Sequence, residues 1–180
     1  MTGSTMSSPT DLERAVSILR RGGVIAMPTD TLYALVAAAR DAEAVRRVFA
    51  MKGRKFSKPL PLFVSGLAMA ERIAVFNPHA RRLAGRFWPG PLTIVLPKQP
   101  AFESEALAGG DTVALRVPDH DLARAVVEAL DAPVTATSAN RSGARDPVSP
   151  SVPSGRCSGS VWGTTPPTPS APWGACSSLS

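Results

Sequence analysis

A short stretch of the chain, residues 52–60, crowds four cations against the start of an apolar run. It reads KGRKFSKPL and contains Lys52, Arg54, Lys55 and Lys58. Because like charges at this spacing repel one another, they either point into water or surround an anion. Guanidinium and ammonium groups gathered at one place suit phosphate oxygens. A solvated helix end, where the macrodipole favours positive charge, is the alternative interpretation.

Three other segments carry polar side chains at the ends of expected strands. They are PTDTLYAL (28–35) with Thr31, DTVALRVPDH (111–120) with Thr112 and Arg116, and TSANRSG (137–143) with Ser138, Asn140 and Ser142. Arg116 stands within an apolar strand, where a buried guanidinium needs an anionic partner. Hydroxyl and amide groups beside a glycine suit phosphate oxygens, although ordinary turns use the same residue types. In open α/β sheets ligands gather at such strand ends, so the four segments together favour one ligand site.

The polar residues include no nucleophile paired with a histidine. His79 lies within an expected helix and His120 beside a helix cap, and both positions favour structural roles. Cys157 and Cys176 are far apart with no histidine near them, which excludes a zinc knuckle or a CxxC redox pair. Cations and hydroxyls act by positioning and by charge neutralisation, which is what phosphoryl-type transfer requires. We therefore expect a nucleotide site whose phosphates face the basic stretch.

Helices and strands alternate along the chain and must position these residues. Apolar periodicity predicts helices at residues 12–21, 41–53, 66–74, 77–88 and 119–130. Short apolar or β-branched runs predict strands at residues 24–28, 59–64, 92–97, 112–118 and 133–140. A capping box of Thr10 and Glu13 is expected to start the first helix, and Asp41 and Asn77 are expected N-caps. The alternation predicts an α/β domain with helices packed on a twisted sheet.

The composition of the 180-residue chain fits one globular domain with a core. Lys and Arg total 20 against 14 Asp and Glu, so the net charge of +6 fits an anionic ligand, either a nucleotide or RNA. The N-terminal region lacks the apolar segment of a signal peptide, and no apolar run reaches the roughly 20 residues of a membrane span. With few cysteines, we expect a cytoplasmic protein that does not enter a membrane.

Five segments, in their order along the chain, resemble the YrdC-like family of L-threonylcarbamoyladenylate synthases. They are PTDTLYAL, KGRKFSKPLPLFV, RFWPGPLTIVLP, VALRVPDHDLARAVVEAL and TSANRSGARDPVSP. The resemblance implies a YrdC-like domain at residues 10–149, with a twisted, open, mixed α/β sheet and flanking helices around a large basic cavity. It also implies a reaction in which L-threonine, bicarbonate and ATP form threonylcarbamoyl-AMP and pyrophosphate. Partner proteins would then transfer the threonylcarbamoyl group to an adenosine of tRNAs that read ANN codons.

The same resemblance assigns roles residue by residue. Thr31 and Arg116 would bind threonine, with Arg116 on the carboxylate. Lys52 and Arg54 would be catalytic, acting on the phosphates and bicarbonate. The residues that would bind the nucleotide are Arg54, Lys58, Thr112, Ser138, Asn140 and Ser142. Mg²⁺ would be held through the ATP phosphates, so no dedicated metal-binding side chain is expected.

The chain departs from the family at three places. Ala34 replaces a usual glycine, which would strain the loop by about 1 kcal/mol if the backbone there has a positive φ. Lys55 replaces a usual proline. Residues 150–180 form a proline- and serine-rich tail, expected to be irregular, in place of the family's final helix and strand, and we hypothesise a shifted reading frame there. That loss would leave one edge of the sheet unpaired and would weaken turnover.

Two other functions fit the same residues. One is a non-catalytic module that binds double-stranded RNA or tRNA through the basic concavity. The other is a carbamoyl-transfer domain of the hydrogenase-maturation type, although that role normally comes with zinc-finger and acylphosphatase domains. Release of pyrophosphate from ATP that requires both threonine and bicarbonate distinguishes the synthase from these alternatives.

Overall fold

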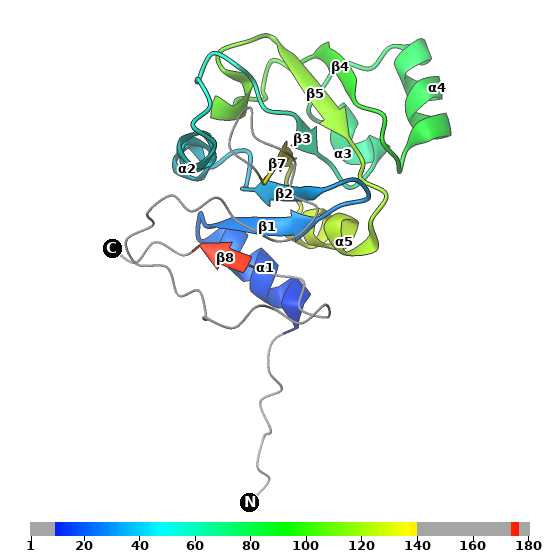
Figure 1. Cartoon of the computed structure of the whole chain (residues 1–180). Coiled ribbons are helices and arrows are strands. Elements are labelled where there is room, and N and C mark those ends of the chain that lie inside the picture. The colour runs from blue at the N-terminus through cyan, green and yellow to red at the C-terminus, as the bar shows by residue number, and fades with distance from the viewer. Residues whose placement is uncertain (1–9, 140–173, 177–180) are drawn as a thin grey trace, which may run out of the picture.

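The computed structural model describes residues 10–139 and the backbone of residues 174–176. Its helices are α1 (Asp11–Arg20), α2 (Ala42–Lys52), α3 (Leu67–Glu71), α4 (Pro78–Phe87) and α5 (Asp121–Leu130), with a short 3₁₀ helix, η1 (Glu105–Leu107). Its strands are β1 (Val24–Pro28), β2 (Tyr33–Val36), β3 (Leu62–Phe63), β4 (Ile94–Pro97), β5 (Thr112–Arg116), β6 (Val134–Thr135), β7 (Thr137–Ser138) and β8 (Gly174–Cys176). In this part of the chain no helix is long and apolar enough to cross a membrane. The mixture of helices and strands confirms the predicted α/β class (Figure 1).

Backbone hydrogen bonds arrange the strands in two four-stranded sheets, ordered β7-β2-β1-β8 and β4-β5-β3-β6. The first sheet is antiparallel throughout. The second is mixed, because β3 runs parallel to β5 while β4 and β6 pair antiparallel with their neighbours. Helices α1 and α5 lie side by side and pack against β1, whereas α3 and α4 flank the second sheet (Figure 1). The mixed sheet with flanking helices therefore agrees with the prediction.

The chain passes from one sheet to the other between β6 and β7. The sequence predicts one strand over residues 133–140, but β6 pairs with β3 and β7 pairs with β2. Ala136 lies between them and donates its backbone N–H to the carbonyl of Pro61. Val134 also forms a bridge to Ala38, just beyond β2. A single run of residues therefore fastens the two sheets together, and this is the region in which the candidate site lies.

Thr135 is the polar side chain that secures this junction. It is fully buried, and its Oγ1 accepts a hydrogen bond from the Ala37 N–H at 3.0 Å. Thr135→Val keeps the shape but leaves a buried N–H without its acceptor, so we expect a loss of about 1–3 kcal/mol in the free energy of unfolding. Urea denaturation measures this loss. Thr137→Val is the matched control, because no hydrogen bond joins the Thr137 hydroxyl to another residue within residues 10–139; equal losses in the two variants would contradict the prediction.

The predicted starts of α1, α2 and α4 agree with the structure, whereas α5 begins at Asp121, two residues after the predicted start, and its N-cap His120 makes no side-chain capping hydrogen bond. Thr10 and Glu13 form both hydrogen bonds of a capping box, and Asp41 and Asn77 accept N–H groups of the first turns of α2 and α4. These signals are local, because each depends on side chains within three residues of the cap. Strand β2 is one of the elements that the sequence analysis misses. Three of its four residues are buried, so it shows no apolar–polar alternation.

An additional strand lies at the outer edge of the first sheet. Residues Gly174–Cys176 pair antiparallel with Val24–Ala26 of β1. The expectation of an unpaired edge is therefore wrong here, because backbone hydrogen bonds can recruit a strand that has no strand-like sequence pattern. Residues 140–173 and 177–180 lie outside the described residues, and with them lies the hypothesised change of reading frame.

Candidate functional site

A pocket of about 150 Å³ lies where the two sheets meet. Its walls come from the β1–β2 loop, β2, β3, β5 and the β6–β7 junction. The lining residues are Thr29, Thr31, Leu32, Tyr33, Ala34, Pro61, Phe63, Thr93, Arg116, Ala136, Thr137 and Ser138. Three of the predicted site residues, Thr31, Arg116 and Ser138, therefore come together from segments that are far apart in the sequence.

Arg116 is the charged residue in the wall of this pocket. It ends β5, where its side chain is 13 % exposed, and its Nε donates to the Gly90 carbonyl at 2.9 Å. Its Nη2 forms an ion pair with Asp30 Oδ2 at 2.5 Å. The prediction that a guanidinium in this apolar strand needs an anionic partner is confirmed, and the partner is a carboxylate of the β1–β2 loop.

The β1–β2 loop is held in shape by Thr29. Its Oγ1 donates to the Leu32 carbonyl at 2.6 Å and accepts the N–H groups of Thr31 and Leu32. The hydroxyl oxygens of Thr29 and Thr31 lie 3.2 Å apart. A hydroxyl that closes a turn in this way orders the loop, so Thr31 is presented to the pocket on a defined backbone.

Lys52 is buried and lies next to Ser138. Buried residues of α2 recur every three or four positions, which carries Lys52, at 3 % exposed, into the interior with the apolar face. Its Nζ donates to the Ser138 carbonyl at 2.5 Å and to the Ser138 hydroxyl at 3.3 Å. The predicted catalytic lysine thus does not line the pocket itself but contacts Ser138, which does.

The other cations of the basic stretch do not converge with Lys52. Gly53 ends α2 in the left-handed conformation, with φ 58°, which redirects the chain after Lys52. Arg54 donates from Nε to the Lys58 carbonyl at 3.1 Å and from Nη2 to the Pro59 carbonyl at 3.0 Å. Lys55 and Lys58 are exposed. Lys55 and Lys58 therefore fit the explanation that the cations point into water, whereas Lys52 is directed inward and the anion between the cations stays a prediction.

Thr112 lies away from the pocket. It begins β5 and is exposed, whereas Arg116 ends the same strand. At the rise of an extended strand their Cα atoms are separated by about 13 Å. Neither Arg54, Lys58 nor Thr112 lines this pocket. Asn140 and Ser142 lie outside the described residues.

Ala34 occupies a regular strand position. It pairs with Met27 in β1 and Ser138 in β7 and has no positive φ. The strain expected from an alanine in place of glycine is therefore absent. Because Ala34 is 5 % exposed and lines the pocket, its methyl group instead takes up part of the pocket wall.

Two residues that line the pocket, Thr93 and Thr137, and one beside it, Asp30, were not singled out from the sequence. Asp30 and Thr137 have polar side chains in quoted motifs, and Thr93 lies within the strand predicted at residues 92–97, directly before β4. The signal for Asp30 was present, because a buried arginine required an anion and PTDT supplies a carboxylate beside two hydroxyls. The identity of the partner could not be read from the chain, since Asp30 and Arg116 are 86 positions apart.

Several carboxylates away from the pocket form ion pairs at the surface. Arg46 on α2 bonds to Glu105 at 2.8 Å and to Glu43 at 2.7 Å. Hydrogen bonds to Glu105 and then Glu43 raise the pKa of Arg46 above its usual value. Within residues 10–139 no three His, Cys, Asp or Glu side chains gather as a metal site.

Comparison with known proteins identifies the family. Residues 17–160 match the Sua5/YciO/YrdC family model, which carries the description "Telomere recombination". The chain belongs to the Sua5/YciO/YrdC family. A threonylcarbamoyl-AMP synthase of Pyrococcus abyssi is 43% identical over 136 residues, which are 75% of this chain and 40% of the relative. A threonylcarbamoyl-AMP synthase of Bacillus subtilis is 37% identical over 149 residues, 82% of this chain and 43% of the relative.

A solved structure supports the same relationship. The crystal structure of P. abyssi Sua5 complexed with L-threonine superposes with a TM-score of 0.72 at 42% identity. The match covers 76% of this chain and 40% of that one. This Sua5/YciO/YrdC member therefore spans about two fifths of the length of these relatives.

Proposed function

We propose that this chain is an L-threonylcarbamoyladenylate synthase, which transfers a nucleotidyl group to form threonylcarbamoyl-AMP from L-threonine, bicarbonate and ATP. The observation that carries the proposal is Arg116, a largely buried cation in the wall of a small pocket that also presents threonine hydroxyls. The curated relatives bear the name of this synthase, and one related structure is titled as a complex with L-threonine.

The pocket has the size and chemistry of an amino-acid site. Its volume of about 150 Å³ is below the several hundred Å³ of a pocket for a larger ligand, so it suits threonine rather than a nucleotide. In the proposed complex the threonine carboxylate meets Arg116 and the Thr31 hydroxyl lies within reach of the substrate. An arginine fork is the side chain best matched to a carboxylate.

The nucleotide would lie beside this pocket, toward Lys52 and Ser138. Lys52 and Arg54 would neutralise the phosphates and bicarbonate. The nucleotide contacts would come from Arg54, Lys58, Thr112, Ser138, Asn140 and Ser142. Arg54 would exchange its carbonyl partners for phosphate. Mg²⁺ would enter with ATP on its phosphates, which fits a site whose side chains are cations and hydroxyls.

The proposed reaction joins the three substrates in two successive bond-forming steps. The threonine amine forms an N–C bond with bicarbonate, and water leaves. An oxygen of the resulting carbamate attacks the α-phosphorus of ATP, and the bond to the β-phosphate oxygen breaks to release pyrophosphate. The protein's contribution is to hold the reactants together and to offset the charge on the phosphates. Partner proteins would then pass the product's threonylcarbamoyl group to tRNA.

The test is pyrophosphate release from ATP by the full-length chain. We expect release that requires both threonine and bicarbonate, and that stops when either is left out. Release that ignores both omissions would count against the proposal. Salt-sensitive tRNA binding without ATP turnover would instead indicate the RNA-binding module. The names of the curated relatives do not favour that alternative or the hydrogenase-maturation one.

A further inference from the structure

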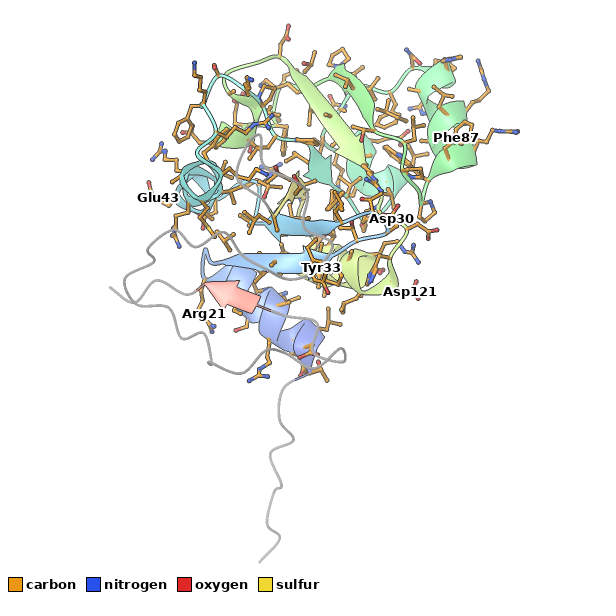
Figure 2. All side chains as sticks on the ribbon, viewed as in Figure 1. Arg21, Asp30, Tyr33, Glu43, Phe87 and Asp121 are labelled. Atoms are coloured by element: carbon orange, nitrogen blue, oxygen red, sulfur yellow. The ribbon has the colours of Figure 1, made fainter. Side chains whose placement is uncertain are left out.

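One ion pair links the two sheets at the edge of the candidate pocket. Asp30 lies in the loop after β1, in the first sheet, and Arg116 ends β5, in the second. Asp30 is exposed as a residue, but its side chain is only 16 % exposed to solvent. It lies next to the end of β5 (Figure 2). Exposed ion pairs contribute little, whereas a pair as shielded as this one determines where its arginine points.

The Arg116 guanidinium is held on three sides. Gly90 accepts from Nε, Asp30 accepts from Nη2, and the ring of Phe63 lies 5.9 Å from Cζ. Gly90 is itself fastened, because its N–H donates to the Val117 carbonyl at 2.9 Å. Within residues 10–139 the N–H groups of Nη1 have no hydrogen-bond partner, and Arg116 lines the pocket. The Nη1 side of the guanidinium is therefore the side that can donate hydrogen bonds to a ligand.

Asp30 does not itself line the pocket. Its neighbours Thr29 and Thr31 do, and the hydrogen bonds of Thr29 order the loop that carries all three. The contact of the Asp30 carboxylate with the pocket is through Arg116, which does line the pocket. We propose that Asp30 is a positioning residue: it orients the Arg116 fork for the carboxylate of the substrate. This inference rests on the proposed function, in which that substrate is threonine.

The physical argument is preorganisation. A carboxylate that binds an arginine edge-on needs the guanidinium plane in one orientation, and a long side chain without fixed neighbours samples several. Asp30 removes that freedom before the ligand arrives and supplies the anion that a shielded guanidinium requires. The effect of losing Asp30 should therefore fall on threonine and not on ATP.

The experiment compares Asp30→Asn with the native full-length chain by calorimetric titration of L-threonine and, separately, of ATP. We expect at least about tenfold weaker threonine binding and less than about twofold change for ATP. Asp119→Asn is the matched control, since it removes the same charge from an exposed pair with Arg124. It should change neither affinity.

Two further variants separate positioning from general damage. Asp30→Glu keeps the charge and should bind threonine more tightly than Asp30→Asn. In an Arg116→Lys background, Asp30→Asn should lose most of its effect, because coupled residues are not additive. Equal threonine affinity in the native chain and Asp30→Asn, or equal loss in Asp30→Glu and Asp30→Asn, would overturn the role of Asp30. If the native chain binds ATP but no threonine, that result contradicts the proposed function itself. The role of Asp30 toward threonine then falls as a consequence.

Discussion

Arg116→Ala is expected to weaken L-threonine binding by about 2 kcal/mol or more, roughly thirtyfold, and to leave ATP binding nearly unchanged. The reason is that Arg116 is the charged residue in the wall of the pocket proposed to hold threonine. Removing it would also leave the shielded Asp30 carboxylate without its partner. Arg116→Lys should restore little of the binding, because a point charge cannot reproduce the edge of a guanidinium fork.

For Arg54→Ala we expect the opposite pattern of ligand affinities when the same two ligands are titrated. It should weaken ATP binding by about 2 kcal/mol or more and affect threonine less, because Arg54 does not line the pocket proposed to hold threonine. Calorimetric titration of each ligand into each variant measures both changes. Arg72→Ala serves as the control, since Arg72 is 60% exposed in a pair with Asp131. Equal, small effects of Arg54→Ala and Arg116→Ala on both ligands would contradict the assignment.

Phe49→Ala is expected to lower the free energy of unfolding by about 3–5 kcal/mol. Phe49 is 1 % exposed on the buried face of α2, so its removal leaves a cavity in the core. Its carbonyl also accepts the Arg54 N–H at 3.1 Å, and its ring stacks on Phe56 at 4.5 Å between centroids. Urea denaturation, with the slope of the transition compared between variants, measures the loss.

Phe56→Ala is the matched control, because it removes the other ring of the same pair. Phe56 is 50% exposed, so we expect a loss of about 0.5–1.5 kcal/mol, the size of a ring–ring contact without much burial. Similar losses from the two substitutions would show that the stacked contact, and not core burial, is what stabilises this end of α2.

The starts of α1, α2 and α4 and most of the strands could be predicted from the sequence because they depend on neighbours along the chain. Thr10 with Glu13, and Asp41, each make the expected capping hydrogen bonds within one turn. The family could likewise be predicted, because five motifs occur in the family's order along the chain. Strand β2 and the division of residues 134–138 between two sheets could not, because they depend on which partners lie across the sheet.

The candidate site was predictable as a set of residues but not as an arrangement. Thr31, Arg116 and Ser138 meet in one pocket, as expected. The basic stretch does not act as a unit, because the buried face of α2 turns Lys52 inward and the left-handed Gly53 directs the chain elsewhere. No local rule shows which of four neighbouring cations is buried, since that depends on the register of the whole helix against the core.

What the sequence by itself determined is the chemistry available: a cation in an apolar strand, hydroxyls in polar turns, and an anion needed somewhere for Arg116. Only the tertiary structure decided that the anion is Asp30, at 2.5 Å, and that the pair links the loop after β1 in one sheet to β5 in the other. The physical reason is range. Caps and periodicities act over a few residues, whereas a shielded ion pair is selected by the packing of strands that are distant in the chain.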